Sequence, residues 1–232
     1  MSIWKYLFNL SERRNWYLMK IPEGPLRDYY ESTFPTPDTD WRQVDYLALD
    51  FETTGLDHAK EEILSIGYAP VKGQSIRLSE ADYYLARPSR DIPEASAVVH
   101  GILDDRAFSA RPLEEVLPRL LHALSGKVML AHHAAIEYNF LSNACKRIYG
   151  YPFIGPVVDT LALEVRAFRS QDKPIRSGDL RLAAARIRYG LPRYPAHNAL
   201  IDAIAAGELF LAQAAYRRGK RAPMLKDLTV IT

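Results

Sequence analysis

Cysteine is nearly missing from this chain of 232 residues, which contains only Cys145. A single cysteine excludes an intramolecular disulfide and any cysteine-rich zinc site. We expect Cys145 to be a small apolar residue of a helix in a reducing cytoplasm. No apolar run approaches the roughly 20 residues that a membrane span needs, and residues 1–20 lack the pattern of a signal peptide. The sequence therefore predicts a cytoplasmic protein without a membrane partner.

Other familiar signatures are also missing. There is no G-x-x-x-x-G-K-[ST] loop, so nucleotide hydrolysis of the P-loop kind finds no support. No internal repeat and no low-complexity tract is present. The overall composition, 48% hydrophobic and 25% charged, is ordinary for a soluble globular protein. The length suffices for one domain with a substantial core.

Charge is distributed unevenly along the chain, although the net charge is only +2. From Thr160 onward there are 13 Lys and Arg against 6 Asp and Glu, which gives this C-terminal part a charge of +7. Such a basic part suits a polyanionic partner, whereas solvated helix faces are the alternative for any single arginine. The candidate basic patch consists of Arg176, Arg181, Arg186, Arg188 and Arg193.

The order of predicted elements indicates an α/β protein. Strands come first, and strands and helices then alternate, which predicts a sandwich with a mixed sheet flanked by helices. The predicted strands are 45–51, 62–71, 74–87, 127–131 and 156–159, with a turn near Lys72-Gly73. The predicted helices are 112–125, 134–149, 160–168, 178–189 and 198–216.

Three regions follow from this pattern. Residues 1–42 are rich in aromatic residues and proline, and we expect a short helix and an extended arm that packs on the domain or on a partner. Residues 43–216 form the predicted main domain. Residues 217–232 are predicted to be a basic, partly loose tail.

The most informative segment is residues 50–57, Asp-Phe-Glu-Thr-Thr-Gly-Leu-Asp, which follow the apolar run 46–49. Side chains alternate along a strand, so Asp50 and Glu52 point to one side while Phe51 turns into the core. Adjacent carboxylates repel each other and are costly to desolvate unless a cation lies between them. Oxygen ligands of this kind suit Mg²⁺ or Mn²⁺. A solvated edge strand is the alternative, but the preceding run is too apolar for an edge.

Two later segments place carboxylates on apolar helix faces. Glu137 shares a predicted inward face with Ala134 and Leu141, and Asp202 shares a predicted stripe with apolar residues of its own helix. An unpaired buried carboxylate is expensive. Both residues are therefore candidate metal ligands.

A histidine precedes the last of these carboxylates. His197 lies five residues before Asp202, just outside the predicted helix, with Asn198 as the expected N-cap. An imidazole with an ordinary pKa of about 6.5 accepts a proton at neutral pH. His197 is therefore the candidate general base.

Together these motifs resemble a known family. Asp50-x-Glu52, Glu137 and His197-x(4)-Asp202 are similar to the three motifs of the DEDDh 3′→5′ exonucleases, which include the proofreading epsilon subunit of bacterial replicative DNA polymerase. Two supporting segments also match, namely Val99-His100-Gly101-Ile102 and Val158-Asp159-Thr160-Leu161. Each motif alone is weak, but five in this order and spacing form a strong signal.

The resemblance implies a ribonuclease H-like fold and a metal-dependent 3′→5′ exonuclease. The enzyme would release nucleoside 5′-monophosphates from nucleic-acid 3′ ends, with single-stranded DNA as the expected substrate. Two Mg²⁺ or Mn²⁺ ions would be held by Asp50, Glu52, Glu137 and Asp202, with His197 as general base. The implied partners are nucleic acid and a polymerase or repair protein, and the implied processes are proofreading and DNA repair.

The resemblance also implies a set of substrate-binding residues. Backbone N–H groups left free around Thr53 and Thr54 would bind the terminal 3′-hydroxyl and so enforce cleavage from the end. For His100, a structural turn before Gly101 is an equal alternative to a nucleotide contact. The expected set is Phe51, Thr53, Thr54, Gly55, Leu56 and His100.

Glu137 departs from the family pattern, which has Asp at this position. Glu keeps the charge and the oxygen ligands but reaches one methylene further, and we interpret it as a working variant. The doublet His132-His133 with Glu137 offers a zinc site as an alternative, although no H-E-x-x-H accompanies it.

Two other functions remain open at this point. An RNA-trimming exonuclease or oligoribonuclease has the same metals, and no residue here recognisably reads a 2′-hydroxyl. A non-catalytic nucleic-acid or polymerase-binding module would be expected to lose ligands, yet four carboxylates and the histidine are all present.

Overall fold

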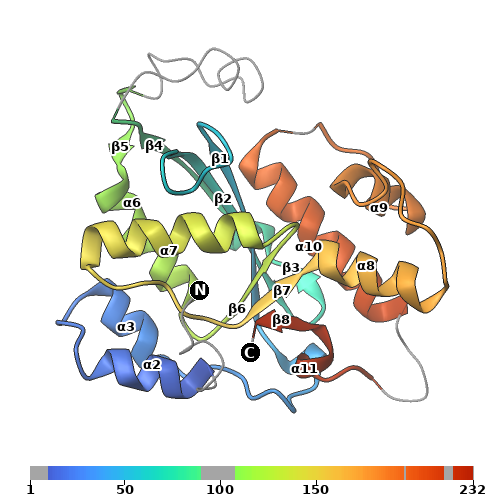
Figure 1. The fold of residues 1–232 in the computed structure, drawn as a ribbon, viewed down its shortest axis with the longest axis horizontal. Coiled ribbons are helices and arrows are strands. Elements are labelled where there is room, and N and C mark those ends of the chain that lie inside the picture. The colour runs from blue at the N-terminus through green and yellow to red at the C-terminus, as the bar shows by residue number, and fades with distance from the viewer. Residues whose placement is uncertain (1–9, 90–107, 196, 217–221, 232) are drawn as a thin grey trace.

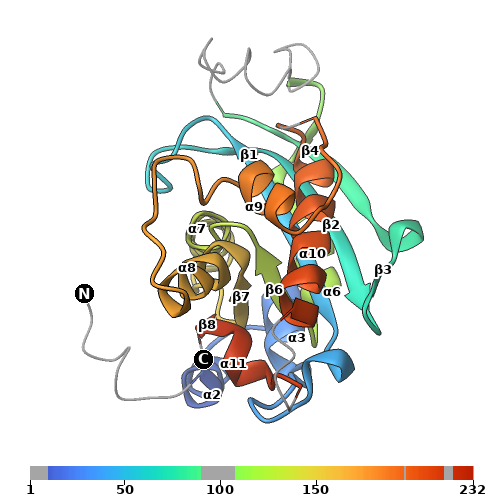
Figure 2. The same ribbon diagram turned by 90° about the vertical axis from the view of Figure 1, so that its right-hand side faces the viewer.

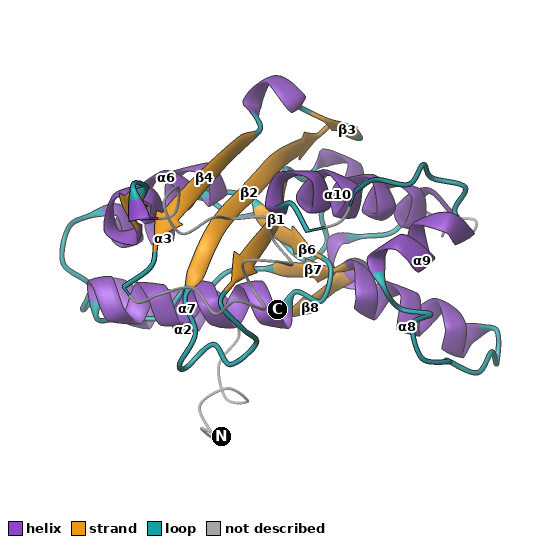
Figure 3. Cartoon of the chain, turned by 90° about the horizontal axis from the view of Figure 1, so that it is seen from above, coloured by secondary structure: helices purple, strands orange, loops and turns teal. Residues whose placement is uncertain are grey.

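The computed structural model describes residues 10–89, 108–195, 197–216 and 222–231, with the side chains of residues 230 and 231 left aside. A central mixed sheet has helices on both faces (Figures 1 and 3). This arrangement confirms the predicted α/β sandwich.

The sheet is mixed because its first hairpin is antiparallel and its centre is parallel. The strands are β1 (Tyr46–Thr53), β2 (Ile63–Lys72), β3 (Ser75–Ile76), β4 (Asp82–Arg87), β5 (Arg111–Pro112), β6 (Val128–Ala131), β7 (Val157–Asp159) and β8 (Thr229–Ile231). β1 pairs antiparallel with β2 and parallel with β6, and β6 pairs parallel with β7. The strand order is β5-β4-β2-β1-β6-β7-β8, with β3 paired to β2. The carboxyl ends of β1, β6 and β7 therefore meet at one edge of the sheet.

Alternating side chains of β1 divide the core into two layers. The helices are α2 (Leu10–Leu18), α3 (Pro25–Glu31), α6 (Leu113–Leu124), α7 (Ala135–Tyr149), α8 (Thr160–Ser170), α9 (Leu182–Arg188), α10 (Ala199–Tyr216) and α11 (Leu225–Leu228), with short 3₁₀ turns at Trp41–Gln43 and Leu78–Glu80. Leu47, Leu49 and Phe51 pack with α6, α7 and the N-terminal helices, whereas Tyr46 and Ala48 pack with α8, α10 and α11. Figure 2 shows α10 lying against the sheet.

One predicted strand is interrupted in the structure. The range 74–87 forms β3, a 3₁₀ turn and β4 instead of one strand. Gly73 and Gln74 both have positive φ, which makes the tight turn expected near this point. Hydrogen bonds at Glu80 and Ala81 then bend the chain away from the ladder. Apolar alternation alone does not distinguish one strand from two short ones.

The described part of the N-terminal region packs on the domain. It forms two helices, α2 and α3, at the lower left of Figure 1, where the sequence predicts one helix and an extended arm. Tyr29 and Tyr30 are fully buried in the core that α6 and α7 cover. Tyr29 stacks on Phe153 at 5.1 Å between ring centroids. Gly155 is needed there, because a Cβ would lie 2.1 Å from the Tyr29 hydroxyl oxygen.

The C-terminal residues also differ from the predicted loose tail. Within residues 222–231, α11 packs on the core and β8 pairs antiparallel with β7. Leu225 and Leu228 are buried, and Arg166 donates to the carbonyls of Asp227 and Thr229. Burial of two leucines and the ladder to β7 explain the order of this segment. Residues 217–221, which hold most of its basic charge, lie outside the described ranges.

α10 is the most apolar long helix among the described residues. By length and composition alone it is able to cross a membrane, and half of it is buried in this fold. Gly207 lies at its contact with β1, where a Cβ would be 3.3 Å from that of Ala48. α10 thus serves as a packed core helix here.

Candidate active site

Three carboxylates meet at the carboxyl edge of the parallel strands. Asp50 and Glu52 lie on β1, and Asp202 lies in the first turn of α10. Each offers one oxygen, and these oxygens all lie within 4.8 Å of one another. Phe51, between the first two, is buried in the opposite layer of the core, as strand alternation predicts.

Gly67 brings α10 close enough to complete this cluster. It pairs with Asp50 across the β1–β2 ladder. A Cβ at this position would lie 2.1 Å from the Leu200 backbone nitrogen and 2.2 Å from the Ala199 carbonyl carbon. The start of α10 therefore rests on bare backbone beside Asp50. Sequence reasoning missed this role, although an isolated glycine inside a strand pattern is a sign of close backbone approach.

His197 is fixed through its backbone to Asp202. Its N–H donates to Asp202 Oδ2 at 2.8 Å, and its φ is 70°, in the left-handed region. Asn198 Oδ1 accepts from the Ile201 N–H at 3.1 Å, which confirms the predicted N-cap. Left-handed non-glycine residues often occur at functional sites. The exposed His197 side chain thus begins from a constrained backbone next to the cluster.

Glu137 faces the cluster from the first turn of α7. It is 4% exposed, and its Oε2 is buried without a hydrogen-bond partner. It does not join the other three carboxylates within 4.8 Å, but its charge contributes to the raised pKa of Asp50. The positive end of the helix dipole favours a carboxylate here.

The carboxylates destabilise one another's charged forms. Burial raises the pKa of Asp50 well above its usual range, and Glu137, Glu52 and Asp202 add to the effect. Burial also raises the pKa of Glu137 to about 8, with repulsion from Asp159 and Glu52 opposed by its own backbone N–H. Burial raises the pKa of Asp202 in the same direction. A divalent cation among these groups would relieve both the desolvation and the repulsion.

Asp159 and His132 support the edge of the site. Asp159 Oδ1 accepts from the N–H groups of His133 and Leu161, each at 2.9 Å, so Asp159 caps the N-terminus of α8. His132 bonds the Thr160 hydroxyl and the Leu180 carbonyl through its two ring nitrogens, each at 2.8 Å. Burial lowers the pKa of His132. With both nitrogens engaged, His132 cannot also bind zinc, and the zinc alternative loses a ligand.

The turn after β1 is more tightly bonded than predicted. The Thr54 N–H donates to the Glu62 carbonyl at 2.9 Å, so the prediction that it is free is wrong. The Thr53 hydroxyl donates to the Gly55 carbonyl at 2.7 Å, and the Thr54 hydroxyl donates to Glu61. The β1–β2 ladder continues past an irregularity at Glu52/Thr53, which accounts for these bonds.

The other predicted substrate-binding residues fall in different environments. Leu56 is 78% exposed at the tip of this turn, next to the half-buried Gly55. Phe51 is 6% exposed and packs in the core, so its side chain presents almost no surface to a substrate. His100 lies outside the described residues.

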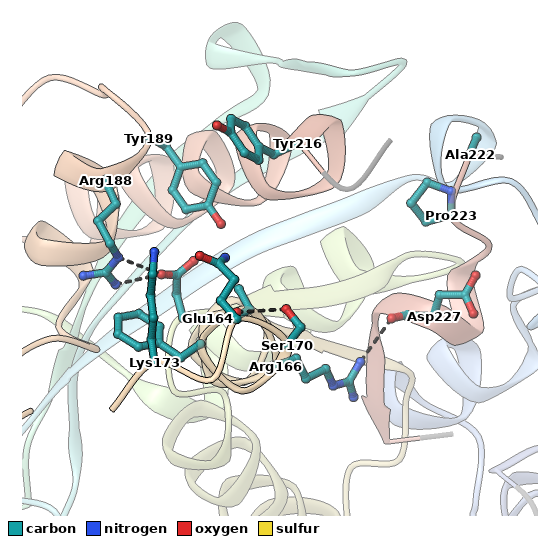
Figure 4. A pocket seen from close by; sticks show the side chains of 13 residues that line it. Glu164, Arg166, Ser170, Lys173, Arg188, Tyr189, Tyr216, Ala222, Pro223 and Asp227 are labelled. Carbon is teal, nitrogen blue, oxygen red and sulfur yellow. Dashed lines mark hydrogen bonds and ion pairs between the residues drawn. The ribbon is translucent and has the colours of Figure 1, made fainter. Parts of the chain in front are cut away.

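The candidate basic patch is only partly formed. Arg186 is 3% exposed, and Arg188 pairs with Glu164 at 2.7 Å. This pair lines a groove of about 890 Å³ between α8 and the C-terminal ends of α9 and α10 (Figure 4). The lining carries charges of both signs and includes none of the clustered carboxylates. The other four arginines of the candidate patch, Arg176, Arg181, Arg188 and Arg193, are exposed, although Arg188 is engaged by Glu164.

A divalent cation fits the carboxylate cluster on two grounds. The donor set consists of hard oxygen atoms, which Mg²⁺ and Mn²⁺ prefer. The orphaned Oε2 of Glu137 is a buried acceptor that needs a positive partner. The cluster is therefore a group of acidic residues able to bind metal.

Comparison with known sequences identifies related proteins. Residues 47–210 match the profile of the family RNase_T, described as Exonuclease. The PolC-type DNA polymerase III of Thermotoga petrophila is 34% identical over 196 residues, which cover 84% of this chain and 13% of the relative. The DNA polymerase III subunit epsilon of Aquifex aeolicus is 26% identical over 72% of this chain and 78% of the relative. The chain thus spans about an eighth of the PolC-type proteins it matches.

Solved structures show the same fold. Exonuclease I of E. coli in complex with an oligonucleotide superposes with a TM-score of 0.65 at 15% identity, over 80% of this chain and 42% of that chain. Exonuclease X in complex with 5′ overhanging duplex DNA gives a TM-score of 0.57 at 21% identity, over 79% of this chain and 98% of that chain. The predicted ribonuclease H-like architecture is confirmed.

Proposed function

This chain belongs to the exonuclease family RNase_T, and on that premise we propose that it is a metal-dependent 3′→5′ exonuclease that releases nucleoside 5′-monophosphates. The family match confirms the resemblance that its motifs predict. The observation that carries the proposal is the convergence of Asp50, Glu52 and Asp202, whose oxygens lie within 4.8 Å although they come from distant parts of the sequence.

In this proposal Asp50, Glu52, Glu137 and Asp202 hold two divalent cations, Mg²⁺ or Mn²⁺. When bound, such ions neutralise phosphate charge and lower the pKa of the attacking water. The carboxylates would fix the position of these ions at the sheet edge, and the ions would offset the repulsion between the carboxylates and the scissile phosphate. Glu137 provides the fourth carboxylate ligand in this proposal, because its Oε2 is buried and has no hydrogen-bond partner.

His197 acts as the general base of the proposed reaction. Its imidazole takes the proton of the attacking water, and the leaving 3′-oxygen departs from the phosphorus on the opposite side. The hydrogen bond from the His197 backbone N–H to Asp202 Oδ2 links this residue to the carboxylate cluster. The loop position is suited to a group that must reach a water molecule.

The terminal nucleoside is proposed to contact the turn after β1. Leu56 presents exposed apolar surface there, and Thr53 and Gly55 shape the turn through their hydrogen bond. Because the Thr54 N–H is already bonded to Glu62, recognition of the 3′-hydroxyl falls to the other groups of this turn.

The proposed substrate is a DNA 3′ end, with single-stranded DNA preferred, and the proposed setting is the bacterial cytoplasm beside a polymerase or repair partner. Relatives named as DNA polymerase III proteins support this choice. Exonuclease I in complex with an oligonucleotide shares the fold. RNA trimming is the second candidate function, since the sequence contains no recognisable reader of a 2′-hydroxyl.

A substrate panel tests these alternatives. Single-stranded DNA and RNA of the same sequence are incubated with Mg²⁺, Mn²⁺ or EDTA, and the products are separated by chromatography. We expect nucleoside 5′-monophosphates from DNA with either metal and none with EDTA. Faster release from RNA would favour the trimming enzyme, and no release from either strand with either metal would favour a non-catalytic module.

A further inference from the structure

A buried arginine anchors the loop between α9 and α10, which leads to His197 and which we call the His197 loop. Arg186, on α9, is 3% exposed. A buried cation is costly unless every donor finds a partner. Its guanidinium donates to the Ala205 carbonyl at 2.6 Å, to the Pro192 carbonyl at 2.9 Å and to Glu208 Oε2 at 2.7 Å. These bonds join three segments, because the donor lies on α9, Pro192 lies in the loop, and Ala205 and Glu208 lie on α10.

Tyr194 completes this arrangement from the loop. The Arg186 guanidinium carbon lies 4.5 Å from the centre of the Tyr194 ring. The Tyr194 hydroxyl donates to Glu208 Oε1 at 3.0 Å. Glu208 therefore uses one oxygen for the arginine and the other for the tyrosine. We call Arg186, Tyr194 and Glu208 the Arg186 clamp.

The position of the clamp relates it to the site. Tyr194 lies three residues before His197, and Glu208 lies on the same helix as Asp202. Asp202 and Glu208 are six positions apart on this helix, a rise of about 9 Å. On the other side of the loop, the His197 N–H is bonded to Asp202. The loop is thus held to α10 at both of its ends.

We infer that the Arg186 clamp is a positioning device that fixes the His197 loop on α10, so that the imidazole meets the water beside the carboxylates. The inference rests on the proposed function, since it assigns the clamp to the general base. Arg186 itself touches no substrate. A misplacement of about 1 Å at a reacting group costs about 100-fold in rate, which sets the size of the expected effect.

The test uses Glu208→Gln and Tyr194→Phe, each in the otherwise unaltered protein and in His197→Ala. Both substitutions keep the shape of the side chain, and both residues are partly exposed, so the fold is expected to persist, as checked by thermal melting. We expect Glu208→Gln to lower kcat by about 10- to 100-fold with KM and Mn²⁺ dependence unchanged. Tyr194→Phe should give a smaller loss of the same kind. In the His197→Ala background neither change should lower kcat further, because the clamp acts through the imidazole.

Arg188→Lys is the matched control. Arg188 lies two residues further along the chain, and its guanidinium binds Glu164 on α8, at the same distance of 2.7 Å, and the Asp179 carbonyl. The Arg188→Lys substitution should leave kcat within about twofold of the value of the unaltered protein, as expected for a change that spares the reacting groups. Equal losses in the His197→Ala background, or an equal loss in Arg188→Lys, would overturn the inference. Full activity of His197→Ala alone would instead overturn the general-base role, which is a separate result.

Discussion

Glu137 is the residue that most distinguishes this site from the pattern of its family. It starts from the first turn of a fixed helix, is almost fully buried, and leaves one oxygen without a partner. The Asp of the usual pattern would end about one C–C bond short of this point, roughly 1.5 Å. The extra methylene therefore decides where the oxygens lie relative to Asp50.

Shortening this side chain should weaken the site. We expect Glu137→Asp to reduce Mg²⁺-supported nuclease activity, because Mg²⁺ demands near-ideal octahedral geometry at about 2.0–2.1 Å. Mn²⁺ should restore part of the activity, and Glu137→Gln should be worse than Glu137→Asp. The measurement is the initial rate of mononucleotide release across a titration of each metal. If Glu137→Ala cleaves as fast as the unaltered protein, Glu137 is no ligand.

At the scale of secondary structure, the decisive contact joins α10 to β2. The helix brings Asp202 to β1 only because Gly67 has no side chain where the Ala199–Leu200 backbone crosses. The same helix packs on Ala48 through Gly207. Two glycines on facing elements thus set the distance between the helix and the sheet.

Adding a methyl group at the first contact should displace the helix. Gly67→Ala places a Cβ 2.1 Å from backbone nitrogen, which no rotamer change relieves. We expect a loss of about 1–3 kcal/mol in the free energy of unfolding and a loss of nuclease activity of about 100-fold or more. Gly207→Ala is the control, because its Cβ meets side-chain atoms at 3.3 Å and lies farther from Asp202. Urea unfolding and rate measurements on both variants would decide, and a Gly67→Ala protein as active as Gly207→Ala would contradict this account.

Hydrophobic periodicity explains why most elements were predictable. The helices 113–124, 135–149 and 199–216 lie within two residues of their predicted bounds, because each carries an uninterrupted apolar stripe. The carboxylates were found for the same reason, since a charge on an apolar face stands out. The packing of α3 and β8 and the bonded turn at Thr54 were not predictable, because they depend on contacts between segments distant in sequence. The Arg186 clamp was not predictable for the same reason, because an arginine among many basic residues suggests a surface patch and its burial depends on contacts with distant residues.

At the scale of the whole molecule, the acidic cluster makes stability depend on pH. Burial and repulsion raise the pKa of Glu137 to about 8 from 4.5, and they also raise those of Asp50 and Asp202. Between pH 4.5 and about pH 8, the ordinary and the raised pKa of Glu137, the folded state binds more protons than the unfolded chain. The free energy of unfolding therefore falls as the pH rises through this window.

Divalent metal should oppose this fall in stability with rising pH. In EDTA we expect the Tm to fall between pH 5 and pH 8. A hundredfold excess of Mn²⁺ over its Kd should stabilise the protein by about 2.7 kcal/mol, or roughly 5–10 °C for a chain of this size, and more at pH 8 than at pH 5. Thermal melts over this pH range provide the measurement, with Glu137→Gln as the control whose Tm in EDTA should vary less with pH. A Tm in EDTA that rises with pH would contradict the burial of these carboxylates.

The carboxylate cluster is proposed to remove nucleotides one at a time from a 3′ end. The most direct measurement follows two copies of one single-stranded DNA, labelled at the 3′ end or at the 5′ end, in Mn²⁺. We predict that the 3′ label appears at once as a mononucleotide, while the 5′-labelled strand shortens in steps of one residue. Asp50→Ala should abolish both signals while keeping the fold, because it removes an oxygen ligand from the cluster. Early release of the 5′ label or internal cuts would contradict 3′→5′ exonuclease activity, and full activity of Asp50→Ala in Mn²⁺ would contradict the role of this cluster.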